Sequence, residues 1–311
     1  MSIFNVRIPG LPMTVVQADG QHVRPVETDE FQISVAETYD VVVVPGDRAY
    51  TLVAESIDRS GMGRATLAPR MGMVAPVPPL RPRPTLGMKD MGMGGMDHGA
   101  GGGTCAPEHA AMGHCTRGGG AMEHKMRDLS LLPPTVKRGP GIDMVAAMPV
   151  DRTGDRPLGL EKEPHRVLTY HQLAPLTPFA DTRPPTRQVN IHLTGNMERF
   201  MWSFDGRKLN EGAEPIRFER NERVQVNLIN NSMMNHPIHL HGHFFEVVTG
   251  QAHGNPVKHT VNVMPGGKAS FLLTADAPGD WAFHCHLLYH MHAGMMNVVK
   301  VRPLDEPGAS S

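Results

Sequence analysis

Aromatic residues and cysteines are scarce in this chain of 311 residues. Phe, Trp and Tyr make up 5% of it and only three cysteines occur, too few for the disulfide framework of a small secreted domain. No apolar run approaches the ~20 residues of a membrane span. The formal charge of −1 excludes a basic field for nucleic acid or an anionic membrane. The N-terminus lacks a basic stretch followed by an apolar one, so we expect no export signal in this chain.

Methionine and histidine are abundant instead, with 22 and 18 residues. Thioethers and imidazoles are ligands of soft and borderline metals, above all of copper. Glycine and proline are also frequent, with 33 and 28 residues, which suits short strands and turns better than long helices. The composition therefore favours an all-β protein that binds a metal.

Three regions differ in composition. Residues 1–68 contain short β-rich runs and are interpreted as part of a β domain, because so few residues rarely form a complete sandwich. Residues 69–165 are rich in Met, Gly, Pro and His without apolar periodicity, which predicts a linker. Residues 166–303 alternate strand candidates, beginning with RVLTYHQL at 166–173, with regular turns; this pattern is typical of a complete antiparallel sandwich or Greek-key barrel. Residues 304–311 form a tail.

Two motifs in the last region carry metal ligands. One is HPIHLHGH, which begins at His236, and the other is HCHLLYHMHAGM, which contains Cys285. A type 1, or blue, copper needs two imidazoles and one thiolate in a plane, with a weak axial thioether. Cys285, His290 and Met295 would supply thiolate, imidazole and thioether from one segment, and His236 is the natural second imidazole.

Strand alternation places the remaining histidines of the two motifs. Neighbouring residues of a strand face opposite sides, so His284 and His286 should point away from the side of Cys285. His239 and His241 should likewise share one face. These imidazoles could serve a second metal site, connected to the thiolate through the backbone of Cys285.

Zinc and a metal-free interpretation are the alternatives. Either motif alone could be a packed strand or a surface accident, but both together, with His290 and Met295 at these spacings, favour a metal site. Zinc also binds Cys and His, although its sites are usually closed tetrahedra without a thioether. Met295 therefore favours copper.

These segments resemble the multicopper oxidases. HPIHLHGHFFEV and GDWAFHCHLLYHMHAGMM are similar to the two copper-binding signatures of that family's last cupredoxin domain. KHTVNVMPGG is similar to a strand that the family has between them. The Met/Gly-rich linker, together with RIPGLPMTVVQADGQHVRPVETDEFQISVAETYDVVV, resembles the periplasmic copper-resistance branch. The resemblance implies a cupredoxin-like fold, with a complete third domain at 166–303 and part of the second at 1–68.

The resemblance also implies roles for single residues. Type 1 copper would be bound by His236, Cys285 and His290 with Met295 axial, type 2 copper by His239, and the type 3 pair by His241, His284 and His286. Cu(I) or phenols would be oxidised at the type 1 copper, and electrons would pass through Cys285, His284 and His286 to a trinuclear site that reduces dioxygen to water. The branch implies a periplasmic location.

The sequence departs from the family in its number of HxH motifs. A trinuclear cluster takes half of its eight histidines from two HxH motifs of the first domain, whereas HxH patterns occur here only at 239–243, 284–286 and 290–292. The chain thus resembles the C-terminal portion of such an oxidase, and we expect little turnover by the chain alone. Its expected partners are Cu(I)/Cu(II) ions and an N-terminal oxidase half that carries HxH motifs. The alternative is a single blue-copper electron-transfer or copper-sequestering protein without oxygen chemistry.

Several residues outside the two motifs are further candidates. A thioether cluster in the Gly-rich loop favours Cu(I) capture over a plain low-complexity linker, because exposed methionines there have no core to fill. It consists of Met88, Met91, Met93, Met96 and His98. Met233 and Met234 could form a Cu(I) entry site or pack in the core. Cys105 and Cys115 could form a disulfide or bind a metal with His109 and His114. His259 is interpreted as structural or exposed.

Overall fold

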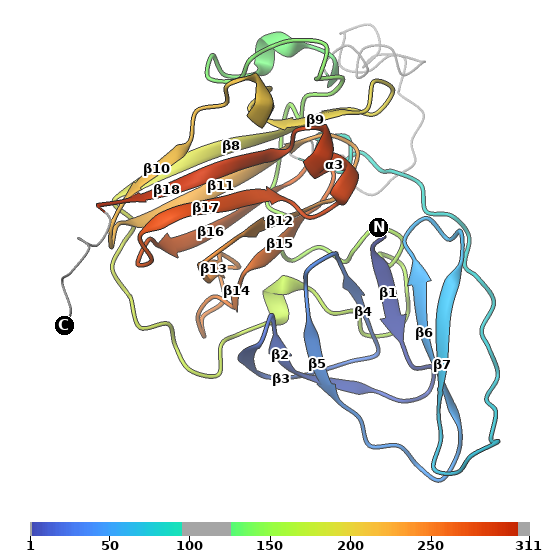
Figure 1. The fold of residues 1–311 in the computed structure, drawn as a ribbon. Coiled ribbons are helices and arrows are strands. Elements are labelled where there is room, and N and C mark those ends of the chain that lie inside the picture. Colours follow the sequence, from blue (N-terminus) through green and yellow to red (C-terminus); the bar gives the residue numbers. More distant parts are fainter. Residues whose placement is uncertain (1, 95–125, 304–311) are drawn as a thin grey trace, which may run out of the picture.

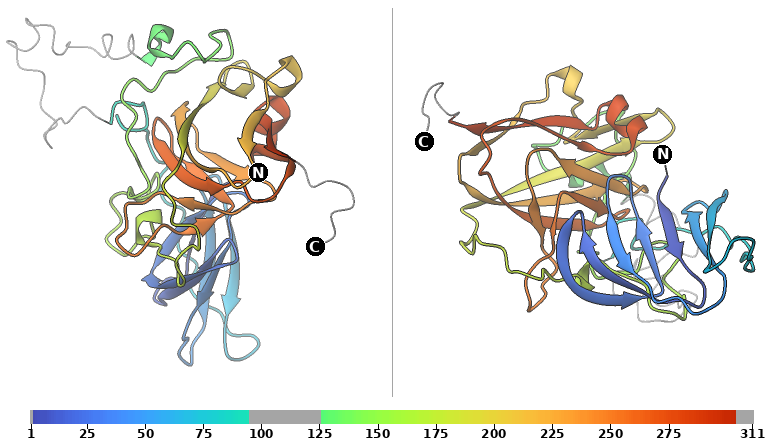
Figure 2. Two further views of the ribbon diagram at one scale, coloured as in Figure 1. Left: turned by 90° about the vertical axis from the view of Figure 1, so that its left-hand side faces the viewer. Right: turned by 60° about the horizontal axis from the view of Figure 1, so that its bottom comes forward.

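The computed structural model of the chain describes residues 2–94 and 126–303. Within these ranges two β units lie next to each other (Figures 1 and 2). The N-terminal unit, blue in Figure 1, has a four-stranded sheet in the order β4-β1-β6-β7 and a three-stranded sheet in the order β3-β2-β5. Its strands are β1 (Phe4–Arg7), β2 (Met13–Ala18), β3 (Gln21–Thr28), β4 (Glu30–Ile33), β5 (Tyr39–Val42), β6 (Tyr50–Ser56) and β7 (Met62–Leu67).

The larger C-terminal unit is a sandwich of a five-stranded and a six-stranded sheet. Their orders are β10-β18-β17-β12-β15 and β14-β13-β16-β11-β8-β9. The strands are β8 (Arg187–Asn196), β9 (Met201–Phe204), β10 (Ile216–Glu219), β11 (Arg223–Asn231), β12 (His236–Leu240), β13 (Phe245–Val247), β14 (Val257–Lys258), β15 (Thr260–Val263), β16 (Lys268–Thr274), β17 (Gly279–Cys285) and β18 (Met296–Arg302). Helices are short, so the all-β expectation is confirmed.

Apolar side chains from both sheets fill the core of this sandwich. Leu228 and Phe271 come from the six-stranded sheet, and Ile238, Phe283 and Val299 come from the five-stranded one; all are at least 97% buried. Because successive side chains of a strand alternate in direction, every second residue of β18 is buried. The same alternation brings Cys285 into this core.

The register of the five-stranded sheet sets the two histidine-rich motifs side by side. Strand β12 pairs with β17, so that Ile238 lies opposite Cys285 and His239 lies opposite His284. After β17 the chain forms the six-residue helix α3 (Leu288–Ala293), which ends at Gly294. Glycine suits this position because its φ of 126° is disfavoured for other residues. The chain then returns along β17 as β18.

The connection between the units packs more closely than its composition predicts. Arg81 lies between the buried carboxylates of Glu30 and Glu55, at 2.6 and 2.5 Å. Arg152 forms a buried ion pair with Asp90 at 2.6 Å. The connection also holds the 3-10 helix η1 (Leu129–Leu131) and a small apolar core of its own, formed by Leu132, Val136, Ile142 and Val145.

The strand predicted at 166–173 is wrong. Val167 makes only an isolated bridge to Glu30, and the 3-10 helix η2 (Tyr170–Gln172) follows. Leu168 and Leu173 are buried in the core of the N-terminal unit, so the segment holds that unit in place instead of adding a strand to the C-terminal one. No helix in the described ranges is long and apolar enough to cross a membrane.

Candidate metal centre

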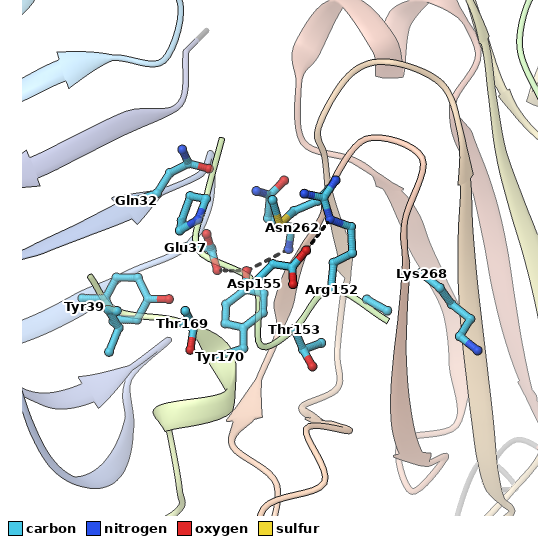
Figure 3. A pocket seen from close by; sticks show the side chains of 14 residues that line it. Gln32, Glu37, Tyr39, Arg152, Thr153, Asp155, Thr169, Tyr170, Asn262 and Lys268 are labelled. Carbon is cyan, nitrogen blue, oxygen red and sulfur yellow. Dashed lines mark hydrogen bonds and ion pairs between the residues drawn. The ribbon is translucent and has the colours of Figure 1, made fainter. Parts of the chain in front are cut away.

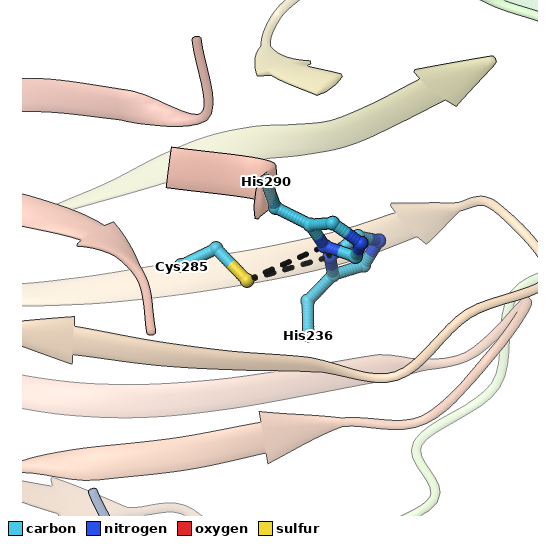
Figure 4. A group of neighbouring side chains, drawn as sticks. All are labelled: His236, Cys285 and His290. Atoms are coloured by element: carbon cyan, nitrogen blue, oxygen red, sulfur yellow. Dashed lines mark hydrogen bonds between the residues drawn. The ribbon is translucent and has the colours of Figure 1, made fainter. Parts of the chain in front are cut away.

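Three donor side chains meet inside the C-terminal sandwich. His236 begins β12, Cys285 ends β17, and His290 lies in α3. Figure 4 shows the thiol of Cys285 and the two imidazoles turned toward one another. The Sγ atom lies 3.7 Å from Nδ1 of His236 and 3.6 Å from Nδ1 of His290, and the two nitrogens lie 3.1 Å apart. Within the described ranges, this is the one group of three His, Cys or acidic residues whose donor atoms gather within 4.8 Å.

These distances fit one metal ion between the three atoms. Metal bonds of ~2.0 Å to nitrogen and ~2.3 Å to sulfur, set ~120° apart, separate sulfur from nitrogen by roughly 3.7 Å and the two nitrogens by roughly 3.5 Å. The sulfur–nitrogen distances match this spacing, whereas the 3.1 Å between the nitrogens requires the rings to part by a few tenths of an ångström. In the metal-free chain these nitrogens can share a proton, which a metal would displace.

Burial sets the protonation of the three donors. Desolvation lowers the pKa of His290 to about 4, and desolvation together with the neighbouring His290 lowers the pKa of His236 well below its usual range. Both imidazoles are therefore neutral near pH 7, the form that binds metals. Burial raises the pKa of the Cys285 thiol, so metal binding must release its proton.

The two imidazoles are oriented in different ways. Nε2 of His236 lies 2.7 Å from Oγ of Ser232, and that hydroxyl donates to Oδ1 of Asn230. This contact leaves Nδ1 of His236 free to face Cys285. The ring of His290 instead stacks on the indole of Trp202, with centroids 4.2 Å apart and planes 14° apart.

Met295 follows two of the three donors closely in the chain and is bound to both through its backbone. The N–H of Cys285 donates to the carbonyl oxygen of Met295 (3.1 Å), and the N–H of Met295 donates to that of His290 (2.9 Å). The Met295 side chain is fully buried in the same apolar core as Cys285. The backbone of Met295 is thus tied to Cys285 and His290, and its thioether side chain lies in the core that contains the Cys285 thiol.

Four further imidazoles gather where β12 and β17 run side by side. Nε2 of His241 lies 3.0 Å from Nε2 of His284. The ring centroids of His284 and His286 are 5.2 Å apart, and that of His239 lies 5.8 and 5.7 Å from them. His241 is exposed, His239 and His286 are half-buried, and burial lowers the pKa of His239 to about 4. The structure brings together the residues that the sequence grouped here.

A fifth imidazole, that of His259, joins this face. Its ring lies 5.0 Å from that of His239 and almost perpendicular to it. The sequence analysis interpreted His259 as structural or exposed, and it gave no role to Ser232 or Trp202. Only the register of β15 against β12, which places Thr260 opposite His239, reveals the proximity.

Met233 and Met234 border a cavity beside the buried triad. The cavity has a volume of about 360 Å³ and lies between the two units, with Leu287, Ile3 and Leu158 among its other lining residues. The methionines are half-buried and precede His236 closely in the chain. Both methionines therefore line this cavity within three residues of a donor of the triad.

The methionines of the predicted thioether cluster differ in burial. Met93 is 1% exposed, because its turn is anchored by Asp90 and crowds Ala146 at Gly92. The expectation that these methionines have no core to fill is therefore wrong for Met93. Met88 and Met91 are half-buried. Met96, His98, Cys105, His109, His114 and Cys115 lie outside the described residues.

Comparisons with known proteins point to one family. Two family models, both described as multicopper oxidase, match residues 182–305 and 1–70. The chain is 45% identical over 310 residues to a copper resistance protein A homolog of Pseudomonas syringae pv. tomato and 44% identical over 330 residues to copper resistance protein A of Escherichia coli. These alignments cover 97% of this chain but 52% and 54% of the relatives. The chain thus spans about half the length of the curated relatives that it matches.

Solved structures show the same fold at low identity. The multicopper oxidase Fet3p, which functions in iron import, aligns with a TM-score of 0.60 at 15% identity, over 97% of this chain and 53% of its own. The L499M mutant of the laccase from B. aclada aligns with a TM-score of 0.57 at 16% identity, over 96% and 49%. The sandwich is therefore cupredoxin-like.

Proposed function

The chain belongs to the multicopper oxidase family, and on this basis we propose that it is the C-terminal part of a copper-resistance oxidase. The observation that carries the proposal is the buried triad of His236, Cys285 and His290 with its matching distances. These three residues would hold a type 1 copper, with Met295 as axial ligand. Copper bound there would supply one-electron redox chemistry.

The imidazoles of His239, His241, His284, His286 and His259, called here the open histidine face, would serve the second half of the reaction. His239 would hold a type 2 copper, and His241, His284 and His286 would contribute to the type 3 pair. Cys285 is joined by one peptide bond to His284 and by another to His286. A short covalent path therefore connects the buried thiolate with the face on which dioxygen would be reduced.

The reducing substrate would approach from the cavity beside Met233 and Met234. Thioethers suit Cu(I), and the apolar wall suits a phenol. Four one-electron donors, either Cu(I) ions or phenols, balance one dioxygen and four protons to give two waters. Met88, Met91, Met96 and His98 would help to capture Cu(I); Met93, being buried, is left out of this role.

The missing ligands must come from another polypeptide segment. The chain offers four cluster-side histidines in its HxH motifs, and its sequence has no HxH before His239. An N-terminal oxidase half carrying two HxH motifs would complete the cluster, with the open face of β12 and β17 as its docking site. We place the assembly in the periplasm, as the copper-resistance branch implies.

A second function is favoured by the same ligand count. The type 1 site has all its ligands in one unit, whereas the open face is incomplete within this chain. The chain could thus act alone as a single blue-copper electron-transfer or copper-sequestering protein, without oxygen chemistry. The two functions differ in copper content and in oxygen consumption.

Copper content and oxygen uptake of the purified chain test the proposal. The chain alone should retain about one tightly bound copper and show little turnover with Cu(I) or a phenol in an oxygen electrode. Addition of a polypeptide with two HxH motifs should raise the copper content toward four and start oxygen uptake. If neither rises with such a polypeptide, the single-copper function is the correct one.

A further inference from the structure

A buried carboxylate of the N-terminal unit reaches the open histidine face. Asp19 lies in the two-residue Asp-Gly turn between β2 and β3, where φ is 50° at Asp19 and 73° at Gly20. Asp-Gly favours such a hairpin turn because both residues tolerate positive φ. The Asp19 side chain is nevertheless fully buried, since the turn is pressed against the C-terminal unit.

Asp19 binds the start of β15 through two backbone N–H groups. The N–H groups of His259 and Thr260 both donate to its Oδ2 atom at 3.1 Å. Its Oδ1 atom accepts the N–H of Thr38 at 3.0 Å and lies 3.0 Å from Nζ of Lys258. The Oδ2 atom therefore fixes the backbone of residues 259–260, while the Oδ1 atom is held by Thr38 and Lys258. Hydrogen bonds to a charged acceptor are stronger than those to a neutral one.

Lys258 balances the charge of this cluster. Its side chain is fully buried, lies 3.3 Å from Oε1 of Glu37 and faces the rings of Tyr39 and Tyr170. A buried carboxylate without a partner would be costly, and Lys258 supplies that partner for Asp19 at 3.0 Å. The cluster joins residues of both units.

A second contact of the same cluster holds β15 two residues further on. Tyr170 donates its hydroxyl proton to Glu37, and the N–H of Asn262 donates to the Tyr170 oxygen at 2.9 Å. Figure 3 shows these three residues along the wall of a cavity of about 40 Å³ at the boundary between the units. Strand β15 is thus fixed at Thr260 by Asp19 of the N-terminal unit and at Asn262 by Tyr170, which is bound to Glu37 of that unit.

The fixed backbone in turn holds the ring of His239. Nδ1 of His239 lies 2.7 Å from the carbonyl oxygen of His259 and 3.1 Å from Oγ1 of Thr260. A ring nitrogen that faces a carbonyl must carry the proton, which leaves Nε2 as the free donor for a metal.

We propose that Asp19 is a positioning residue for His239: it fixes the carbonyl of His259 and the hydroxyl of Thr260, which select the tautomer of His239 that presents Nε2 to a metal. This inference rests on the proposed role of His239 as a copper ligand. It makes the geometry of the open face depend on the N-terminal unit.

The test compares Asp19→Ala with Asp40→Ala, a matched control in which an exposed carboxylate of the same unit is removed. Long-range ¹⁵N–¹H NMR of the copper-free, full chain reads the tautomer of His239, assigned with His239→Gln. The wild type and the control should show one Nδ1–H tautomer, and Asp19→Ala should show a mixture. Titration with Cu(II) against a chelator, continued beyond the one tightly held copper, should show the affinity of the weaker, His239-dependent site reduced on the order of 10-fold in Asp19→Ala.

The experiment distinguishes failure of the Asp19 inference from failure of the proposed type 2 role of His239. A single Nδ1–H tautomer in folded Asp19→Ala overturns the positioning. If binding of copper beyond the first, tightly held ion is indifferent to His239→Gln, the type 2 role alone is overturned, because the NMR comparison needs no copper. If Asp19→Ala does not fold, the variants Thr260→Val and Thr260→Ser provide the test. Thr260→Val should weaken His239-dependent copper binding several-fold, and Thr260→Ser should preserve it. Equal copper affinities in the two variants would refute the inference.

Discussion

At the scale of single residues, the proposed copper ligands His236, Cys285 and His290 would be completed by Met295 in the axial position. Its side chain is fully buried, so replacement by leucine is close in volume and should not open the site to water. Met295→Leu should keep the blue colour, which arises from the thiolate. It should raise the reduction potential, because loss of the weak axial bond favours Cu(I). Spectroelectrochemical titration measures the shift, and an unchanged or lower potential would show that Met295 is not axial.

Trp202 is the second residue whose role the geometry makes testable. Its stack on His290 should hold the ring in place, as hydrogen-bonded partners do for other metal ligands. Trp202→Leu should lower copper affinity on the order of 10-fold and change the charge-transfer band, while Trp202→Phe should preserve both. Phe200→Ala, at an exposed neighbouring ring, is the control. Equal affinities in Trp202→Leu and wild type would remove Trp202 from the account.

The buried histidines predict how the copper-free protein responds to acid. His290 has a folded pKa of about 4, below the ordinary value of about 6.5. The unfolded state therefore binds more protons between these values, and the free energy of unfolding falls as pH drops from about 6.5 toward 4. The loss should reach on the order of 3 kcal/mol for His290 at pH 4. Urea unfolding at several pH values measures it, and His290→Gln should reduce the slope.

At the scale of elements, the turn at residues 87–94 belongs to the folded structure. Met93→Ala should destabilise the protein by about 2–5 kcal/mol, because it leaves a cavity under a buried side chain. Met71→Ala, at a fully exposed methionine, should change stability by less than about 0.5 kcal/mol. Thermal unfolding distinguishes the two variants. Equal melting temperatures of the two variants would show that the Met93 side chain does not contribute to a packed core.

The strands that carry the site could be predicted from their motifs. Each motif contains metal-binding residue types at the two-residue spacing of a β-strand. Alternation in HCH separates Cys285 from its two neighbours, and the core position of Cys285 agrees with that prediction. The segment 166–173 could not be assigned from its pattern, because its leucines serve the core of the other unit. Propensity describes a segment locally, whereas tertiary contacts decide where its apolar face is buried.

At the scale of the whole molecule, the contact between the units lay beyond sequence reasoning. Asp19 and Thr260 are separated by 241 positions, and the Asp-Gly turn by itself predicts only a hairpin. The close packing of the connection between the units was also not predicted. Arg81 and Arg152 form ion pairs with distant residues that no local sequence pattern indicates. The meeting of His236, Cys285 and His290 was predictable because these donors are concentrated in two short motifs.

The absorption spectrum of the Cu(II)-loaded chain, read together with its copper content, tests the central claim most directly. The account predicts an intense blue band from thiolate-to-copper charge transfer and about one tightly held copper per chain, with the band lost in Cys285→Ser. The serine hydroxyl is a hard and poorly ionised ligand, so the variant should hold copper weakly and without colour. A colourless wild-type chain with one bound Cu(II), or a Cys285→Ser chain that stayed blue, would contradict the account.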